Sequence, residues 1–405
     1  MLDLTKLALQ MQGISNHLAQ EAAASRTRLE RAQHLVTQAA QHQAILVQMG
    51  QEWRDRLSFT AAEPMEPMET KVAIATPPAQ HTVLATDGSQ IAPSHHEIAY
   101  CYLINIGRVV LHYGQNRQPL LDSLPEVFYQ SDDLYGARKW GIGTEEWMGY
   151  RRTVTEVEML AELAAGIASS PPQASLATLA STLAPTLALV DGSLIYWFLD
   201  GLPGEARDRI LPPILEAWEQ LQALRVPFVG YVSASRSTES LNFLRLQSCP
   251  YDFPDCATHC EGRGDGAPCQ VFTPLRDVTL WSTMLRPGER GPLWRSSAKI
   301  LAEYGLQQTI YFCYVHVGAE IARLEFPAWV GEDATLLGSA LSLVLGQVHK
   351  GYGYPVALAE AHNQAVVRGG DRARFFAMLE RQMVKAGLRN VGTSFKEARK
   401  RGSIA

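Results

Sequence analysis

Two aspartates stand at equivalent places after two apolar runs of the chain. Asp87 follows Thr-Val-Leu-Ala-Thr, Asp191 follows Leu-Ala-Leu-Val, and Gly-Ser comes directly after each aspartate. Apolar runs of this length are typical of buried strands, so each carboxylate is expected at a strand end. Asp-Gly-Ser is also ordinary turn chemistry. Two copies nevertheless favour a site for Mg²⁺ or Mn²⁺, because these ions prefer oxygen ligands.

A glutamate and a histidine are candidates to complete this set. On the helix expected over residues 151–169, Glu158 falls at the margin of the apolar stripe at 100° per residue, whereas Glu156 points further away. We therefore predict Glu158 as the ligand, with Glu156 as its nearest competitor and a solvated glutamate as the ordinary alternative. His362 lies on a later helix face, as a ligand, a proton-transfer group or a core histidine.

Four cysteines form a separate group, Cys249, Cys256, Cys260 and Cys269, with six, three and eight residues between them. Four thiolates can hold Zn²⁺ and replace a missing hydrophobic core, and His259 is a substitute ligand. The spacing is not that of a common zinc ribbon. An iron–sulfur cluster, unliganded thiols and a disulfide therefore stay open as alternatives.

The chain divides into segments that must position these residues. Residues 1–60 are expected as an N-terminal helical extension, and 61–80, rich in Pro, Met and Glu, as a linker. Residues 81–385 are expected as the main domain with a Cys-rich insertion at about 249–269, and 386–405 as a basic C-terminal tail. In the extension, an apolar stripe either packs on its own domain or pairs with a second subunit.

Within the main domain, the first strand leads to Asp87. A hairpin is expected next, with Glu97–Ile106 and Val109–Tyr113 joined by a Gly107-Arg108 turn, and then a surface excursion over residues 120–150. A second hairpin is expected from 308–315 and 321–327. Strand 226–232 ends in a polar cluster in which Arg236 can contact phosphate oxygens, although a helix N-cap near Thr238 explains the cluster equally well.

Composition restricts the class of protein. Among the 405 residues, 46% are hydrophobic and 19% charged, as in soluble globular proteins, and the net charge of −5 gives no global attraction to nucleic acid. The N-terminus has no secretory pattern, and no apolar run approaches the ~18 residues of a membrane span. Six cysteines in so long a chain favour reduced thiols. We therefore expect a cytoplasmic protein with no membrane segment.

The order of elements resembles the ribonuclease H-like fold, an α/β fold with a mixed β-sheet flanked by helices. A strand bearing Asp, a hairpin, a helix bearing Glu, a strand bearing Asp and a late helix bearing His follow one another along the chain. In that fold the carboxylates meet at one edge of the sheet and bind two divalent ions. Two ions about 4 Å apart can activate water and stabilise the leaving oxygen of a phosphodiester.

A series of short motifs also resembles the landmarks of NurA nucleases over residues 80–370. In order they are Asp87-Gly-Ser89, Asp191-Gly-Ser193-Leu194, Arg286-Pro-Gly-Glu-Arg290, Arg323-Leu-Glu325-Phe-Pro327, and Tyr354-Pro355 with Ala361-His362. The Cys-rich segment departs from the archaeal pattern and indicates a bacterial member. The resemblance implies manganese-dependent 5′-to-3′ exonuclease and single-strand endonuclease activity on DNA, a homodimeric ring-like assembly, and a HerA-type hexameric ATPase partner in DNA end resection and repair.

The resemblance also assigns roles to residues. Asp87, Glu158 and Asp191 would bind Mn²⁺ or Mg²⁺, and His362 would bind the second ion or assist proton transfer. The predicted contacts to single-stranded DNA and duplex ends are Ser89, Ser193, Arg236 and Tyr354. Two other functions remain: a non-catalytic DNA-binding or assembly subunit of an ATPase-translocase complex, and a ribonuclease or phosphoesterase of the same fold. The nearly complete set of acids and His362 favours the nuclease.

Overall fold

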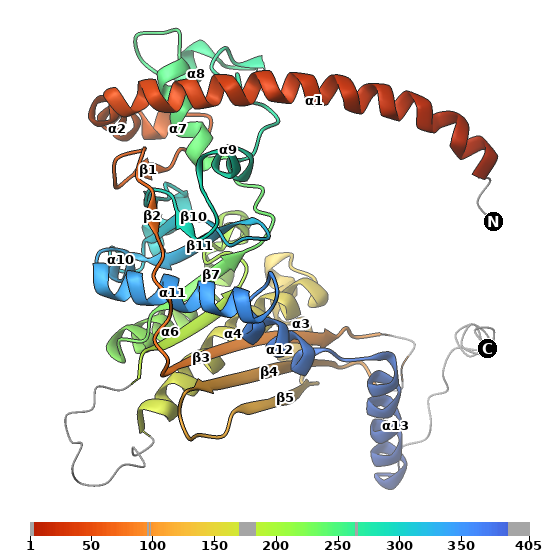
Figure 1. Ribbon diagram of the computed structural model, residues 1–405. Coiled ribbons are helices and arrows are strands. Elements are labelled where there is room, and N and C mark those ends of the chain that lie inside the picture. Colours follow the sequence, from red (N-terminus) through yellow and green to blue (C-terminus); the bar gives the residue numbers. More distant parts are fainter. Residues whose placement is uncertain (1–3, 95–96, 98, 170–183, 264–265, 388–405) are drawn as a thin grey trace, which may run out of the picture. The chain divides into compact units, whose positions relative to one another are not determined.

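The computed structural model describes residues 4–94, 97, 99–169, 184–263 and 266–387 (Figure 1). The chain forms two compact units, each built from separate stretches. Unit 1 comprises Met1–Ala75, Gly192–Ile195 and Gly230–Ala334, and unit 2 comprises Thr76–Asp191, Tyr196–Val229 and Thr335–Ala405. Residues 81–385, expected as one domain, thus contribute to both units. The basic tail from residue 388 onward lies outside the described residues.

Unit 2 contains a mixed sheet in the order β6-β3-β4-β5. Its strands are β3 (His81–Ile91), β4 (Tyr102–Tyr113), β5 (Leu120–Phe128) and β6 (Thr186–Asp191). The β3–β4 and β4–β5 pairs are antiparallel, whereas β3 and β6 are parallel. Six consecutive residues at the start of β3 are buried, as expected for a strand covered on both faces. The mixed sheet agrees with the expected α/β class.

The expected turn at Gly107 was wrong, because β4 runs straight through it. A Cβ on Gly107 would collide with the carbonyl oxygen of Ala361 and lie 2.5 Å from the nitrogen of Ala365, both in helix α12 (Val356–Ala365). The glycine therefore allows a helix to pack closely on the strand. Residues 120–150, expected as a surface excursion, instead supply β5, α3 (Ser131–Tyr135), η2 (Gly136–Trp140) and the start of α4 (Thr144–Ser169).

Helices of unit 2 cover this sheet and carry two of the candidate site residues. Helix α4 packs on β3 with one side and on α6 (Leu211–Ala223) with another, and α12 packs on β3 and β4. The remaining elements of the unit are η3 (Trp197–Gly201), α5 (Gly204–Arg207), α11 (Ala334–Lys350) and α13 (Gly369–Lys385). Because α4 and α12 both contact β3, side chains from each can approach Asp87.

Unit 1 contains a second group of strands in the order β1-β9-β10-β11-β7, with β2 beside β8 and β8 beside β10. Strands β10 (Ile310–His316) and β11 (Ile321–Pro327) form the expected hairpin. The others are β1 (Glu63–Pro64), β2 (Val72–Ala73), β7 (Phe228–Val232), β8 (Glu289–Arg290) and β9 (Trp294–Arg295). The residues expected as a linker therefore include two short strands.

The helices of unit 1 pack around one core that includes the buried rings of Trp281, Trp294, Phe312 and Tyr314. They are α1 (Leu4–Gln41), α2 (Gln43–Glu52), η1 (Arg54–Arg56), α7 (Glu239–Ser248), α8 (Cys256–His259), α9 (Asp277–Met284), η5 (Lys299–Glu303) and α10 (Ala328–Gly331). The core joins the end of the N-terminal extension to the β10–β11 hairpin.

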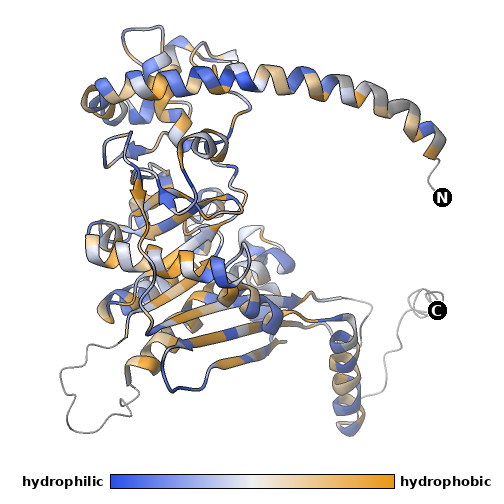
Figure 2. Cartoon of the chain, in the orientation of Figure 1, coloured by the Kyte–Doolittle hydropathy of each residue, from blue (hydrophilic) through white to orange (hydrophobic). Residues whose placement is uncertain are grey.

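Helix α1 is 38 residues long and changes character along its length. Hydrophobic residues recur along it among hydrophilic ones (Figure 2). Near its end Leu35 and Val36 are buried in the core of unit 1, whereas toward its start Met11, Ile14 and Leu18 are exposed. Neither α1 nor any other helix of the described residues is long and apolar enough to cross a membrane.

Candidate active site

The parallel pairing of β3 with β6 brings the two aspartates to the same sheet edge. Thr86 pairs with Val190, so Asp87 and Asp191, each one residue further along its strand, stand at matching positions. Asp87 retains 20% of its side-chain exposure, and Asp191 is exposed. Partial burial of its carboxyl group and the neighbouring charge of Asp87 raise the pKa of Asp191. A hydrogen bond from Tyr354 and the nearby His362 act in the opposite direction and lower it. The parallel register thus puts the two carboxylates within electrostatic reach of each other, although only Asp191 ends its strand and β3 continues past Asp87.

Glu156 of α4 joins the two aspartates. A Cβ on Gly88 would collide with Glu156 Oε1, so this carboxylate lies directly over the backbone after Asp87. The carboxyl group of Glu156 is enclosed by protein, although 21% of the surface of the whole side chain is exposed to solvent. Burial raises the pKa of Glu156 to about 8; Arg152 opposes this rise, while Asp87 and Asp191 add to it. Three carboxylates from three elements therefore share one site.

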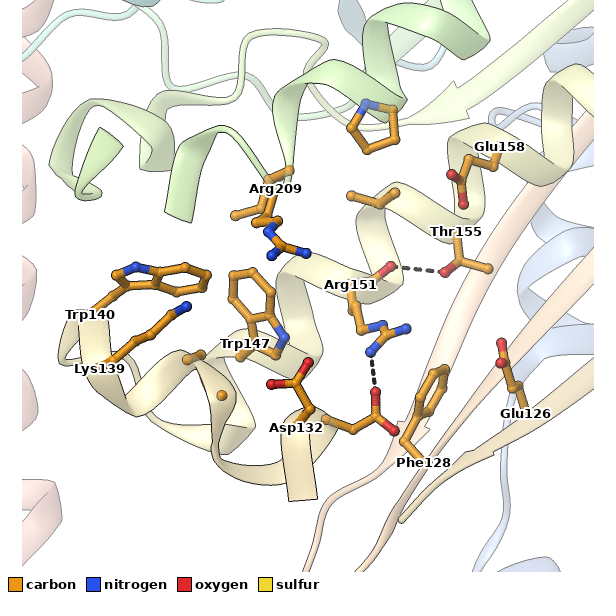
Figure 3. A pocket seen from close by; sticks show the side chains of 16 residues that line it. Glu126, Phe128, Asp132, Lys139, Trp140, Trp147, Arg151, Thr155, Glu158 and Arg209 are labelled. Carbon is orange, nitrogen blue, oxygen red and sulfur yellow. Dashed lines mark hydrogen bonds and ion pairs between the residues drawn. The ribbon is translucent and has the colours of Figure 1, made fainter. Parts of the chain in front are cut away.

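Glu158, which we predicted for this role, points elsewhere. It is exposed and lines a cavity of about 470 Å³ together with Arg151, Thr155 and Glu126 (Figure 3). Residues two apart on a helix point about 200° apart, so the acid that faces the cavity cannot also face β3. The prediction mistook the face of α4, because the helix packs on both β3 and α6 and its apolar stripe does not distinguish them.

Gly88 also has a different setting from the one expected. It lies inside β3 and not in a turn, and a Cβ there would meet Arg152 Cγ at 2.7 Å as well as Glu156. The second Asp-Gly-Ser does turn, because Gly192 has a positive φ of 101°. The two copies therefore use glycine for two purposes: close approach of α4 side chains at Gly88, and left-handed backbone at Gly192.

His362 and Tyr354 each hold one aspartate. His362 Nδ1 lies 2.8 Å from Asp87 Oδ2, and its side chain is 66% exposed. With the proton on Nδ1, the ring donates to Asp87 and leaves Nε2 as an acceptor facing solvent. The Tyr354 hydroxyl donates to the Asp191 carboxylate. The structure thus brings both predicted residues to the aspartates.

The predicted DNA contacts are placed differently. The Ser89 hydroxyl donates to the carbonyl of Ala365 in α12, and the Ser193 hydroxyl donates to Glu325 Oε2 at 2.8 Å within unit 1. Both hydroxyls therefore hold the local fold. Arg236 is exposed in unit 1, and its backbone carbonyl accepts a hydrogen bond from the Arg276 guanidinium.

Two further residues, one beside Glu156 and one close in sequence to Tyr354, escaped the sequence analysis. Arg152 Nε lies 3.2 Å from Glu156 Oε1, one turn earlier on α4; the i,i+4 spacing reveals it only once Glu156 is chosen. Tyr352 is 99% exposed and has a positive φ of 55°. A bulky residue in this conformation is an outlier. Tyr352 lies two residues before Tyr354, and its glycine neighbours are the only sequence feature that marks it as unusual.

The donor set fits a divalent metal ion. Three carboxylates offer the hard oxygen ligands that Mg²⁺ and Mn²⁺ prefer. Burial raises the pKa of Glu156, and the charges of Asp87 and Asp191, which a cation would offset, add to the rise. In the described residues, however, no three His, Cys, Asp or Glu side chains already surround a common metal position. Each carboxylate is instead held by a protein partner, Asp87 by His362, Glu156 by Arg152 and Asp191 by Tyr354.

The four cysteines line one small pocket in unit 1 together with His259, and all six cysteines of the chain are free thiols. They lie in a segment that contributes none of the three acids described above. The acids and the thiols are therefore separate groups, each complete within its own unit.

Comparisons with known proteins bear on the acid group. A family model described as the NurA domain matches residues 81–367, which include Asp87, Glu156, Asp191 and His362. The crystal structure of the NurA nuclease from Sulfolobus solfataricus is similar in fold, with a TM-score of 0.50 and 12% identity over 95% of this chain and 98% of that chain. A crystal structure of NurA with manganese aligns at a TM-score of 0.33 and 10% identity, covering 87% of this chain and 97% of that one. No curated protein sequence matches the chain.

Proposed function

The chain belongs to the NurA domain family and is a nuclease, a phosphodiester hydrolase, and we propose that it cleaves DNA at the site formed by Asp87, Glu156 and Asp191. The observation that carries this proposal is the convergence of three carboxylates from β3, α4 and β6 at one accessible sheet edge. We propose that the fold is ribonuclease H-like, as the order of elements along the sequence suggested.

We assign Asp87, Glu156 and Asp191 as the residues that would hold Mn²⁺ or Mg²⁺. When bound, such ions activate water and stabilise the charge on the scissile phosphate. Metal binding requires deprotonated ligands, so Glu156 releases its proton when it becomes a ligand. Arg152 then stays beside its carboxylate and holds it over Gly88.

His362 and Tyr354 position the aspartates and handle protons. Hydrogen bonds from outer residues orient carboxylate ligands, which is the role of the Tyr354 hydroxyl toward Asp191. His362 does the same for Asp87 through Nδ1, while its exposed Nε2 accepts a proton from the attacking water or returns one to the leaving oxygen.

DNA contact is assigned to the loop before α12 in place of Ser89 and Ser193. Tyr352 presents its ring fully to solvent in a strained backbone conformation, and strained residues gather at functional sites. Aromatic rings bind single strands by stacking on bases, at about 1–3 kcal/mol per base. The hydroxyl of Tyr354 is already used by Asp191, which leaves Tyr352 as the stacking residue.

The finer activities follow from family membership. We propose 5′-to-3′ exonuclease and single-strand endonuclease activity in DNA end processing and repair, in the cytoplasm, together with a HerA-type ATPase. We also propose a homodimer in which α1 pairs with α1 of a second copy. Leu4, Met11, Ile14 and Leu18 are exposed and follow the alternating spacing of a coiled-coil seam.

The direct test is cleavage of labelled single-stranded and duplex DNA with Mn²⁺, with RNA substrates alongside. Asp87→Asn, Glu156→Gln and Asp191→Asn should each lose about 100-fold or more, since a metal supplies several kcal/mol to the transition state. Glu158→Gln is the matched control and should stay near wild type. Equal cleavage by Glu156→Gln and Glu158→Gln would reject the site. A folded but inactive wild type would favour a DNA-binding subunit, and a preference for RNA substrates would favour a ribonuclease.

A further inference from the structure

The four thiols of unit 1 face one enclosed space. Cys249, Cys256, Cys260 and Cys269 line a pocket of about 10 Å³, close to the smallest volume that holds one water molecule. Cys256 and Cys269 are buried, and the other two are half-buried. Four cysteines separated by up to twenty positions in sequence thus line the same small pocket.

The segment that carries these thiols has little else to hold it together. Its one α-helix in the described residues is the single turn α8, and the large ring of Phe253 is 57% exposed. Between Cys249 and Cys269, the buried residues of the described part are Pro254, Cys256, Ala267 and Cys269. Small segments without a hydrophobic core are commonly held by disulfides or metal ions. Disulfides are not formed here, because all the cysteines are free thiols.

We propose that Cys249, Cys256, Cys260 and Cys269 bind a metal centre through four thiolates, as Zn²⁺ or as an iron–sulfur cluster. Four thiolates are the donor set that both centres prefer. Each cysteine gives its proton to solvent as its sulfur bonds to the metal. No three of these side chains yet surround a common position within the described residues, so binding draws the thiolates inward.

The charges around the pocket suit such a centre. Arg245 Nη2 donates to Cys269 Sγ at 3.5 Å, and its guanidinium stacks 3.7 Å from the ring centre of Phe59. A fixed cation beside a tetrathiolate offsets part of its negative charge. His259 lines the same pocket, but its ring stacks on Tyr251 with centroids 4.2 Å apart. The four cysteines are therefore the ligands, and His259 packs beside them.

The centre fastens the N-terminal extension to the rest of unit 1. Arg56, just after α2, donates two hydrogen bonds to Asp255 at 3.0 and 2.8 Å and a third to Thr258. The Trp53 ring stacks on Phe253 with centroids 5.4 Å apart. Each of these partners lies within three residues of Cys256, so a metal that fixes Cys256 also fixes the surface on which the end of α2 rests.

The first test measures metal content. Full-length protein purified without oxygen should contain about one zinc per chain or about two to four irons with equivalent sulfide and a visible absorption band. Single Cys→Ser variants at the four positions should lose most of the bound metal. Cys101→Ser, which removes a buried thiol of unit 2, and His259→Ala should retain the metal. Metal-free wild type that also fails to take up Zn²⁺, or iron with sulfide, would overturn the proposal.

The second test separates a metal centre from simple loss of folding. Far-ultraviolet circular dichroism should show that Cys260→Ser, at a half-buried position, retains its helices. Proteolysis between α2 and β1 should then be faster in Cys260→Ser and in chelator-treated wild type, and metal should slow it only in wild type. Identical cleavage with and without metal would contradict the fastening role, and disulfides in the native protein would contradict the metal centre itself.

Discussion

Nδ1 of His362 lies 2.8 Å from Oδ2 of Asp87, across 275 positions of sequence. A histidine that donates to a carboxylate fixes the orientation of its oxygens. The contact joins α12 to β3 within unit 2, and the glycine at position 107 allows the same helix to lie close to the neighbouring strand. The position of α12 therefore determines both the packing of the sheet and the orientation of the first aspartate.

His362→Ala should weaken the metal dependence of cleavage. Loss of an outer hydrogen bond to a ligand typically costs about 10–100-fold in metal affinity or activity. We expect the Mn²⁺ concentration for half-maximal cleavage to rise by that factor, measured by metal titration at fixed DNA. His349→Ala, at an exposed position of α11, is the control and should titrate like wild type. A normal titration for His362→Ala would show that the contact has no part in metal binding.

Glu156 should make stability fall with pH in the absence of divalent ions. Its folded pKa, raised to about 8 by burial, exceeds the ordinary value of about 4.3 for an unfolded glutamate. The folded state then binds the proton more tightly, so this contribution is fully present below about pH 4 and is lost as the pH rises through about 8. Urea unfolding of metal-free protein should show this decline, and Glu156→Gln should flatten it. A decline unchanged in Glu156→Gln would assign it to another group.

Gly88→Ala should damage the site more than the fold. The added methyl group would meet Arg152 Cγ at 2.7 Å and collide with the Glu156 carboxylate. The Glu156 carboxylate is the end of a flexible side chain and can move aside, and the Arg152 side chain can change rotamer. We therefore expect cleavage to fall by about tenfold or more while stability falls by about 1–3 kcal/mol. Gly149→Ala is the control, because its Cβ meets nothing within 4 Å. Full activity in Gly88→Ala would show that Glu156 need not lie over Gly88.

Arg323 should be among the costliest side chains to remove from unit 1. Its guanidinium lies 2.7 Å from both Glu239 and Glu325, and all three side chains are nearly fully buried. Removing one partner of a buried ion pair costs about 3–5 kcal/mol, so Arg323→Met should lower the free energy of unfolding by that amount. Arg295→Met breaks the more exposed pair with Glu63 and should cost about 1 kcal/mol or less. Equal costs in urea unfolding would contradict this distinction.

Charged residues on the exposed stripe of α1 should separate the proposed dimer. The double variant Met11→Glu and Leu18→Glu places carboxylates in the seam, and like charges there oppose helix pairing. Light scattering after size-exclusion chromatography should report monomers for this variant and dimers for wild type. Leu306→Glu changes a residue that is 89% exposed elsewhere in unit 1 and should remain dimeric. A dimeric double variant would place the interface on another surface.

The sequence by itself determined the features that depend on local pattern. The apolar runs before Asp87 and Asp191 predicted two buried strands, and both strands are present, because burial of consecutive apolar residues needs no knowledge of distant partners. Asp191 ends its strand as predicted, whereas β3 continues past Asp87 to Ile91. The β10–β11 hairpin was predicted for the same reason. Motif order also identified the family, and it singled out His362, which lies beside Asp87.

Only the tertiary structure decided which glutamate joins the aspartates. Glu156 and Glu158 lie on one helix that packs on two sides, so periodicity alone cannot tell the face on β3 from the face on the cavity. Gly107 resembled a turn because the helix that requires it lies about 250 residues later. Strand β5 resembled a loop because most of its residues are exposed. In each case the deciding contact comes from a segment distant in sequence, where local pattern carries no information.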